Sequence, residues 1–219
     1  MPNGAQHPLT PELPAQLESE SLSALAHDET HAELELVDAA LSAQHARGLT
    51  LRAVRLIKSD LSDSRLDHLT LTNSQLEGCN LANIQSRSAE LSRVSIGTSR
   101  LTGIALSEAT LRDVTIRDCR VDLASFGFSR LERVSFEGCL LAQAAFLDAQ
   151  LENVRFHDCD LTSADFRGAR LRACEFRRSD LTDLQGVESL RGAAFEWSDI
   201  VNMAGTWAAA LGIEVLDSE

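Results

Sequence analysis

Cysteine and histidine are the side chains of this 219-residue chain that could hold a metal ion or carry redox chemistry. There are five cysteines and six histidines, and four of the histidines lie in the first 45 residues. The cysteines form no C-x-x-C motif and no liganding pair at the spacing of a zinc site. We therefore expect no cofactor and no metal site, and we interpret the thiols as small buried side chains.

The sequence also lacks the common catalytic motifs. The sequence contains no G-x-S-x-G, no P-loop and no G-x-G-x-x-G after a strand. We therefore expect a protein that is not an enzyme and has no small-molecule substrate. Any function should then depend on the outer surface.

The elements that position these residues follow an unusual period. A large apolar residue returns every fifth position from Leu51 to Leu181, over about 27 pentads, and Ser86 is the one clear lapse. An α-helix would spread a five-residue repeat around its whole circumference, because five residues turn it about 140° past a full turn. A strand would point residues five apart to opposite faces. A short extended piece followed by a turn, in every pentad, fits the spacing.

A second inward position lies two residues before each large residue, since residues two apart on an extended segment share a face. It holds small side chains, and all five cysteines occupy it: Cys79, Cys119, Cys139, Cys159 and Cys174. Phenylalanines recur at an interval of 20 in two sets, at 126, 146 and 166 and at 136, 156 and 176. Four pentads therefore make one coil, and the two sets should meet in the interior from opposite faces.

These pentads resemble the pentapeptide-repeat family, whose consensus is A-[DN]-L-x-x. The segments SADFRGARL (163–171) and GCNLANI (78–84) match it closely. The resemblance implies an all-β solenoid, a right-handed quadrilateral β-helix whose coils stack at the strand spacing. We expect an acidic, irregular or short-helical segment at 1–33, the β-helix at 34–185, and a final out-of-frame partial coil, capping helix and terminal strand at 186–219.

The C-terminal region should close the solenoid, because stacked repeats need caps. After Leu181 the frame breaks and resumes one residue out of step at Leu190 and Phe195. Ser198 is a candidate N-cap of the following helix. The resemblance implies that this element mediates homodimerisation in some members, so the helical stripe supplies our candidate cap or dimer contacts: Met203, Trp207 and Leu211.

The formal net charge is -13, but it is concentrated at the ends. Residues 1–45 hold eight acidic and no basic side chains, whereas residues 46–181 hold 19 basic and 18 acidic ones. No apolar run approaches the roughly 18 residues of a membrane span, and the N-terminus has no signal-peptide pattern. We therefore expect a cytoplasmic protein without membrane contact.

Outward-facing residues supply the candidate binding surfaces. One set is an apolar protein-binding patch: Leu123, Phe128, Leu140 and Leu147. The charged set is sorted by face, with Arg93, Arg112, Arg130, Arg133, Arg170 and Arg172 beside the all-Leu column at Leu51 to Leu171, and Asp60, Asp63, Asp122, Asp160 and Asp180 on the opposite face. Scattered exposed apolar residues and ordinary ion pairing along stacked ladders are the alternatives.

The leading hypothesis is a non-catalytic solenoid whose outer faces bind another protein, which the sequence does not identify. The alternative comes from the resemblance, because quinolone-resistance members mimic DNA and bind DNA gyrase or a related type II topoisomerase. DNA carries dense negative charge along its whole length, whereas this repeat region is nearly neutral. The overall acidity and the mixed Arg face argue against direct nucleic-acid binding.

Overall fold

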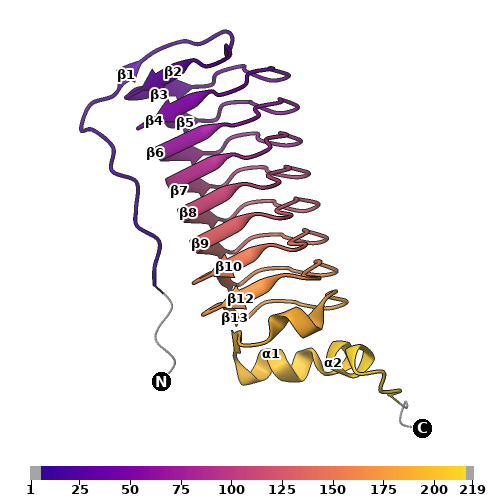
Figure 1. The fold of residues 1–219 in the computed structure, drawn as a ribbon. Coiled ribbons are helices and arrows are strands. Elements are labelled where there is room, and N and C mark those ends of the chain that lie inside the picture. Colours follow the sequence, from indigo (N-terminus) through magenta and orange to yellow (C-terminus); the bar gives the residue numbers. More distant parts are fainter. Residues whose placement is uncertain (1–5, 216–219) are drawn as a thin grey trace.

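The computed structural model describes residues 6–215, which form a stack of coils joined in one parallel sheet of 14 strands (Figure 1). This confirms the expected all-β solenoid. The strands in chain order are β1 (Glu18–Ser19), β2 (Thr30–Ala32), β3 (Leu34–Val37), β4 (Thr50–Arg52), β5 (Arg55–Ile57), β6 (Thr70–Glu77), β7 (Glu90–Gly97), β8 (Thr110–Arg117), β9 (Arg130–Glu137), β10 (Gln150–Glu152), β11 (Arg155–His157), β12 (Arg170–Arg172), β13 (Glu175–Arg177) and β14 (Ala194–Phe195).

Each coil contains 20 residues, because partners in adjacent strands differ by 20. Leu71 of β6 pairs with Leu91 of β7, which pairs with Leu111 of β8. We name the four faces by their inward columns, in chain order around the coil. Face A holds Leu51, Leu71, Leu91, Leu111, Leu131, Leu151 and Leu171; face B holds Leu56, Leu76, Ile96, Ile116, Phe136, Phe156 and Phe176; face C holds Leu61, Leu81, Leu101, Val121, Leu141, Leu161 and Leu181; face D holds Leu66, Ser86, Leu106, Phe126, Phe146 and Phe166.

The corners between faces have a left-handed backbone conformation. Every fifth residue from Asp28 to Asp183 has a positive φ, between 48° and 72°. Half of these positions are Gly, Asn or Asp, the residues that adopt this region most readily. The pentad therefore combines a short extended piece with one left-handed residue that turns the chain onto the next face.

Aromatic rings fill the C-terminal half of the interior. Phe146 stacks on Phe126 and Phe166, with ring centroids 5.1 and 4.7 Å apart. It also meets Phe136 and Phe156 edge-on, at 6.2 and 5.6 Å. The two phenylalanine columns thus meet in the interior, as the sequence predicted.

The N-terminal half is filled by aliphatic side chains and is less complete. An apolar cavity of about 50 Å³ lies among residues such as Leu71, Leu91 and Leu101. The cavity remains because Leu and Ile side chains are smaller than the stacked rings further along.

The N-terminal segment differs from the expected boundary at residue 34. Parallel pairing already begins with β1 on β3 and with β2 on β4, and Leu25 is buried. Within residues 6–33, where we expected an irregular or short-helical segment, no residue is helical. Residues 6–17 run along the side of the stack toward the C-terminal coils, as an extended arm (Figure 1).

The C-terminus caps the stack. Phe195 of β14 pairs with Phe176 at an offset of 19, which confirms the one-residue shift in frame. A 3-10 turn, η1 (Val187–Leu190), precedes β14, and two short helices follow: α1 (Trp197–Asn202) and α2 (Ala204–Ala210). Helix α1 begins after Glu196, so Ser198 is not the N-cap. Ile213 to Val215 are not in a strand, and the rest of the expected terminal strand lies outside the described residues.

Candidate protein-interaction surfaces

The apolar candidates, named the apolar strip below, lie along faces C and D on two neighbouring coils. Leu123, Phe128 and Leu140 are 56%, 62% and 44% exposed. Leu147 is less exposed and is half-buried. The structure brings Phe128 next to Leu147, since the Phe128 N–H donates to the Leu147 carbonyl at 2.9 Å. Leu140 lies at the start of face C, between Arg120 and Asp160 in the stack, and is set apart from the others.

Two members of this strip occupy unfavourable backbone positions. Leu123 and Phe128 stand at successive corners of one coil, with φ of 59° and 58°. A non-glycine residue in this region costs of the order of 1–3 kcal/mol. Each is the only large apolar residue in its corner column among residues 28–183. The column of Leu123 also holds Gly103, and that of Phe128 holds Asp148. Neither exposed side chain recovers this cost by burial.

Three of the six candidate arginines near face A pair with acids of the neighbouring coil. Arg112 lies 3.2 Å from Glu132, and Arg133 donates two hydrogen bonds to Asp113 at 2.7 and 2.9 Å. Arg172 also pairs with Glu152. Arg93 contacts the N-terminal arm, described below. These stacked ion pairs support the alternative in which the Arg face is a structural ladder.

The acids of face C have a local structural role. The Oδ1 atoms of Asp60, Asp160 and Asp180 each accept the N–H of the residue two positions ahead, at 2.9 Å. Hydrogen bonds from Ser62 and Thr182 hold the pKa values of Asp60 and Asp180 below their usual range. Asp63 accepts from the Asn83 amide and Asp122 from the Thr102 hydroxyl. These hydrogen bonds and ion pairs give most of the candidate charged residues a role in stabilising corners or ladders.

The cap contacts divide into two groups. Met203 is buried, and Trp207 meets Phe195 edge-on at 6.2 Å, so both pack on the last coil. Leu211 is 76% exposed and does not belong to that contact. Trp197 and Val201, one helical turn apart on α1, are exposed as well, at 79% and 55%. We did not select these two residues from the sequence, although their i, i+4 spacing off the inward stripe could have revealed them.

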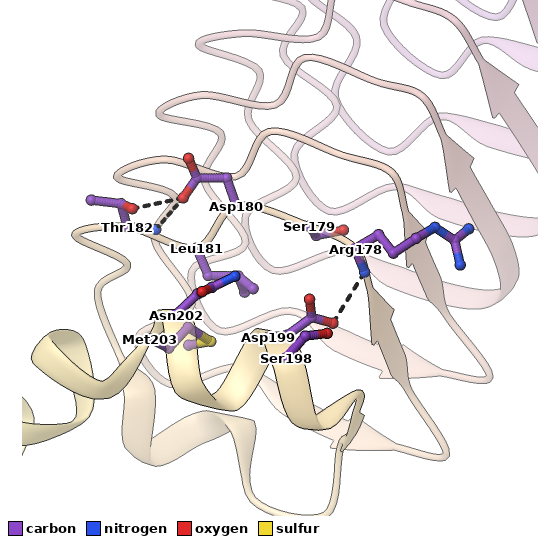
Figure 2. Close-up of a pocket in the computed structure, with 9 residues that line it drawn as sticks. All are labelled: Arg178, Ser179, Asp180, Leu181, Thr182, Ser198, Asp199, Asn202 and Met203. Carbon is purple, nitrogen blue, oxygen red and sulfur yellow. Dashed lines mark hydrogen bonds between the residues drawn. The ribbon is translucent and has the colours of Figure 1, made fainter.

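A groove of about 500 Å³ separates helix α1 from the last coil (Figure 2). Asp199 points up from the helix, and its Oδ2 accepts the Arg178 N–H at 3.0 Å. One coil earlier the corresponding N–H, that of Asp158, donates to a main-chain carbonyl. The buried carboxylate of Asp199 therefore replaces the carbonyl that a further coil would supply.

Models of two repeat families match the chain. The model described as a pentapeptide repeat region matches residues 69–146 and 124–185, and the model described as pentapeptide repeats (8 copies) matches residues 47–83. The chain belongs to the pentapeptide-repeat family. No curated protein sequence matches it significantly.

Solved pentapeptide-repeat structures resemble it at low sequence identity. HetL, a protein involved in heterocyst differentiation regulation from the cyanobacterium Nostoc sp. Strain PCC 7120, is 21% identical, over 76% of this chain and 89% of that one, with a TM-score of 0.37. Full-length QnrB1, a plasmid-mediated fluoroquinolone resistance protein, is 17% identical, over 90% and 100%, with a TM-score of 0.42. Superpositions of this quality carry no information on function.

The cysteines of this pentapeptide-repeat rod are all buried and free. Burial raises the pKa of Cys119 to about 12 and that of Cys174 to about 11, so neither is a reactive thiolate near neutral pH. Within residues 6–215, no group of three or more His, Cys, Asp or Glu could hold a metal ion. Over the same residues, every helix is too short or too polar to cross a membrane.

Proposed function

We propose that this pentapeptide-repeat rod is a non-catalytic scaffold that binds another protein through the apolar strip of Leu123, Phe128, Leu140 and Leu147. One observation carries the proposal: Leu123 and Phe128 hold large, exposed apolar side chains at left-handed corners, half of which hold Gly, Asn or Asp. Residues that cost stability and stay exposed are most simply explained by binding.

The test replaces both corner residues by asparagine, which tolerates the left-handed conformation. Leu123→Asn/Phe128→Asn should lose the partner captured from a native lysate while unfolding at the same temperature as the wild type or higher. Ser88→Asn, at a corner of the same column as Phe128, is the matched control and should keep the partner. If both variants retain every captured protein, the strip is not the binding surface.

Association through the cap is a second use of the surface, because Trp197 and Val201 of α1 and Leu211 after α2 leave apolar side chains exposed. A homodimer would cover them. Sedimentation of wild type and Trp197→Ser/Val201→Ser would test this, and we expect a dimer only for the wild type. A monomeric wild type contradicts it.

DNA mimicry with binding to a type II topoisomerase is the alternative. The net charge of -13 favours it. The pairing of acids with arginines along face A weighs against it, because mimicry needs unpaired charge along the rod. Inhibition of gyrase supercoiling by micromolar protein, or protection of gyrase from a fluoroquinolone, would support this alternative over the scaffold.

A further inference from the structure

The corner between faces A and B carries a regular alternation of side chains. In successive coils it presents Asn73, Arg93, Asp113, Arg133 and Asn153, all with positive φ. Hydrogen-bond acceptors thus recur at every second coil, with an arginine between them. Because coils stack at about 4.8 Å, the acceptors are about 9.6 Å apart.

The N-terminal arm binds to this column through its main chain. The Gln6 N–H donates to Asn153 Oδ1 at 3.4 Å, and the Leu9 N–H donates to Asp113 Oδ1 at 3.1 Å. The Glu12 carboxylate lies 3.8 Å from the Arg93 guanidinium. Three residues of the arm therefore span two coils of the rod.

This ratio matches the polyproline II conformation. That helix has three residues per turn and rises about 3.1 Å per residue, or about 9.3 Å per turn. Pro8, Pro11 and Pro14 recur at an interval of three, and residues 6–14 form neither helix nor strand. An extended chain with this pitch places an N–H opposite an acceptor once per turn, in register with every second coil.

A third acceptor continues the series without a partner. Asn73 lies two coils before Asp113, and its Oδ1 is buried and accepts no hydrogen bond within residues 6–215. By the same register, the N–H three residues after Leu9, that of Glu12, is the next donor along the arm. The corner therefore provides one more acceptor than the arm uses.

The two sides of this contact differ in how firmly they are held. The Asp113 side chain is only 4% exposed and is fixed by Arg133 through two hydrogen bonds. Leu9 is 53% exposed, and the Glu12 side chain is 81% exposed. The column is preorganised, whereas these two arm side chains stay largely in solvent.

We propose that the corner between faces A and B is a docking surface for an extended, proline-containing segment of another protein, and that the arm occupies it in cis. The segment has proline every third residue, main-chain N–H groups at the same interval and an acidic side chain that reaches Arg93. This corner carries none of Leu123, Phe128, Leu140 and Leu147, so the proposal stands independently of the function proposed above.

The experiment frees this docking surface in the full chain. Leu9→Pro removes the N–H that binds Asp113 and keeps the polyproline conformation, whereas Thr10→Pro removes an N–H for which the structure has no acceptor among residues 6–215. The probe is a fluorescein-labelled peptide with the sequence of residues 6–16. In anisotropy titrations it should bind the Leu9→Pro protein at least about tenfold more tightly than the wild type or Thr10→Pro, the factor expected of one charge-assisted hydrogen bond.

A rod-side variant shows where the probe binds. Adding Asp113→Ala to Leu9→Pro should abolish the tighter binding, with unfolding temperatures confirming that both proteins fold. Equal affinity for all proteins, or tight binding without Asp113, overturns the proposal. If the wild type is a dimer that Leu9→Pro converts to a monomer, the occupant is the arm of a second copy. That result would overturn the proposal that another protein binds here.

Discussion

The two halves of the rod share one backbone but have different interiors. From Leu51 to Ile116 the large inward side chains are aliphatic and enclose a narrow cavity, whereas from Phe126 onward two columns of stacked rings meet edge-on. The 20-residue register is the same in both halves. The coil therefore requires only a large apolar side chain at each fifth position, while the choice of side chain sets how completely the interior is filled.

The difference bears on the proposed binding strip, which lies over the first coils of the aromatic half. Phe126 and Phe146 lie directly inside the coils that carry Phe128 and Leu147. A densely packed interior holds the exposed side chains in fixed positions, which reduces the entropy that binding must overcome.

The largest expected effect is the removal of one ring from the aromatic half. Phe146→Ala should lower the free energy of unfolding by roughly 3–5 kcal/mol, because Phe146 is fully buried and contacts four other rings. Denaturant titration measures it. Phe128→Ala, an exposed phenylalanine two residues from Phe126, is the control and should not lower stability. Equal losses would mean that inward and outward positions are wrongly assigned.

A matched pair of substitutions tests whether the halves differ in packing. Leu101 lines the cavity, whereas Leu141, two coils further along the same column of face C, does not. Leu141→Phe should cost about 1–3 kcal/mol through overpacking. Leu101→Phe should cost less, because the cavity receives part of the ring. If denaturant titrations gave equal losses of unfolding free energy for the two variants, the proposed difference in packing between the halves would be wrong.

Acid should weaken the ion pair of Asp113 and Arg133, which joins neighbouring coils at the corner between faces A and B. Burial alone would raise the pKa of Asp113. Hydrogen bonds from Arg133 and the Leu9 N–H, together with the nearby positive charges, lower it by more, so the net pKa shift is downward. Such a carboxylate stabilises the fold above its unfolded pKa of about 3.9, and this stability is lost as the pH falls through the lower folded pKa. We expect a lower unfolding temperature at pH 3 than at pH 6, and a weaker dependence in Asp113→Asn. A melting curve independent of pH would contradict the ladder.

The smallest effect is expected at an exposed ion pair. Arg112→Ala should change the free energy of unfolding by less than about 1 kcal/mol, because Arg112 is 52% exposed and its pair with Glu132 is screened by water. Thermal melts at low and high salt would measure the difference. A loss comparable to that of Phe146→Ala would show that the ladders, rather than the interior, hold the coils together.

Local periodicity made most of the fold predictable. The pentad frame indicated which residues face inward, including the five cysteines and the two phenylalanine columns. The sequence also held an unused signal, since Gly, Asn or Asp at half of the corners marks the left-handed turns. The candidate strip could be selected for the same reason: Leu123 and Phe128 are apolar at outward positions of a known frame.

Local periodicity could not predict the contacts of the N-terminal arm or of the cap. Leu9 and Asp113 are 104 positions apart, and Gln6 and Asn153 are 147 apart, so no repeat in the chain connects them. The start of α1 and the role of Asp199 depend on how the last coil ends, because the exposed Arg178 N–H needs an acceptor that no further coil provides.

The sequence by itself determined the coil, since each pentad repeats the same choice of inward side chains and the same turn. Only the tertiary structure decided what covers the coil, because the arm and the helices pack against surfaces that exist only after the coils have stacked. The pairing of three arm residues with two coils is the clearest case: the proline interval is visible in the sequence, and the acceptor interval is created by the stack.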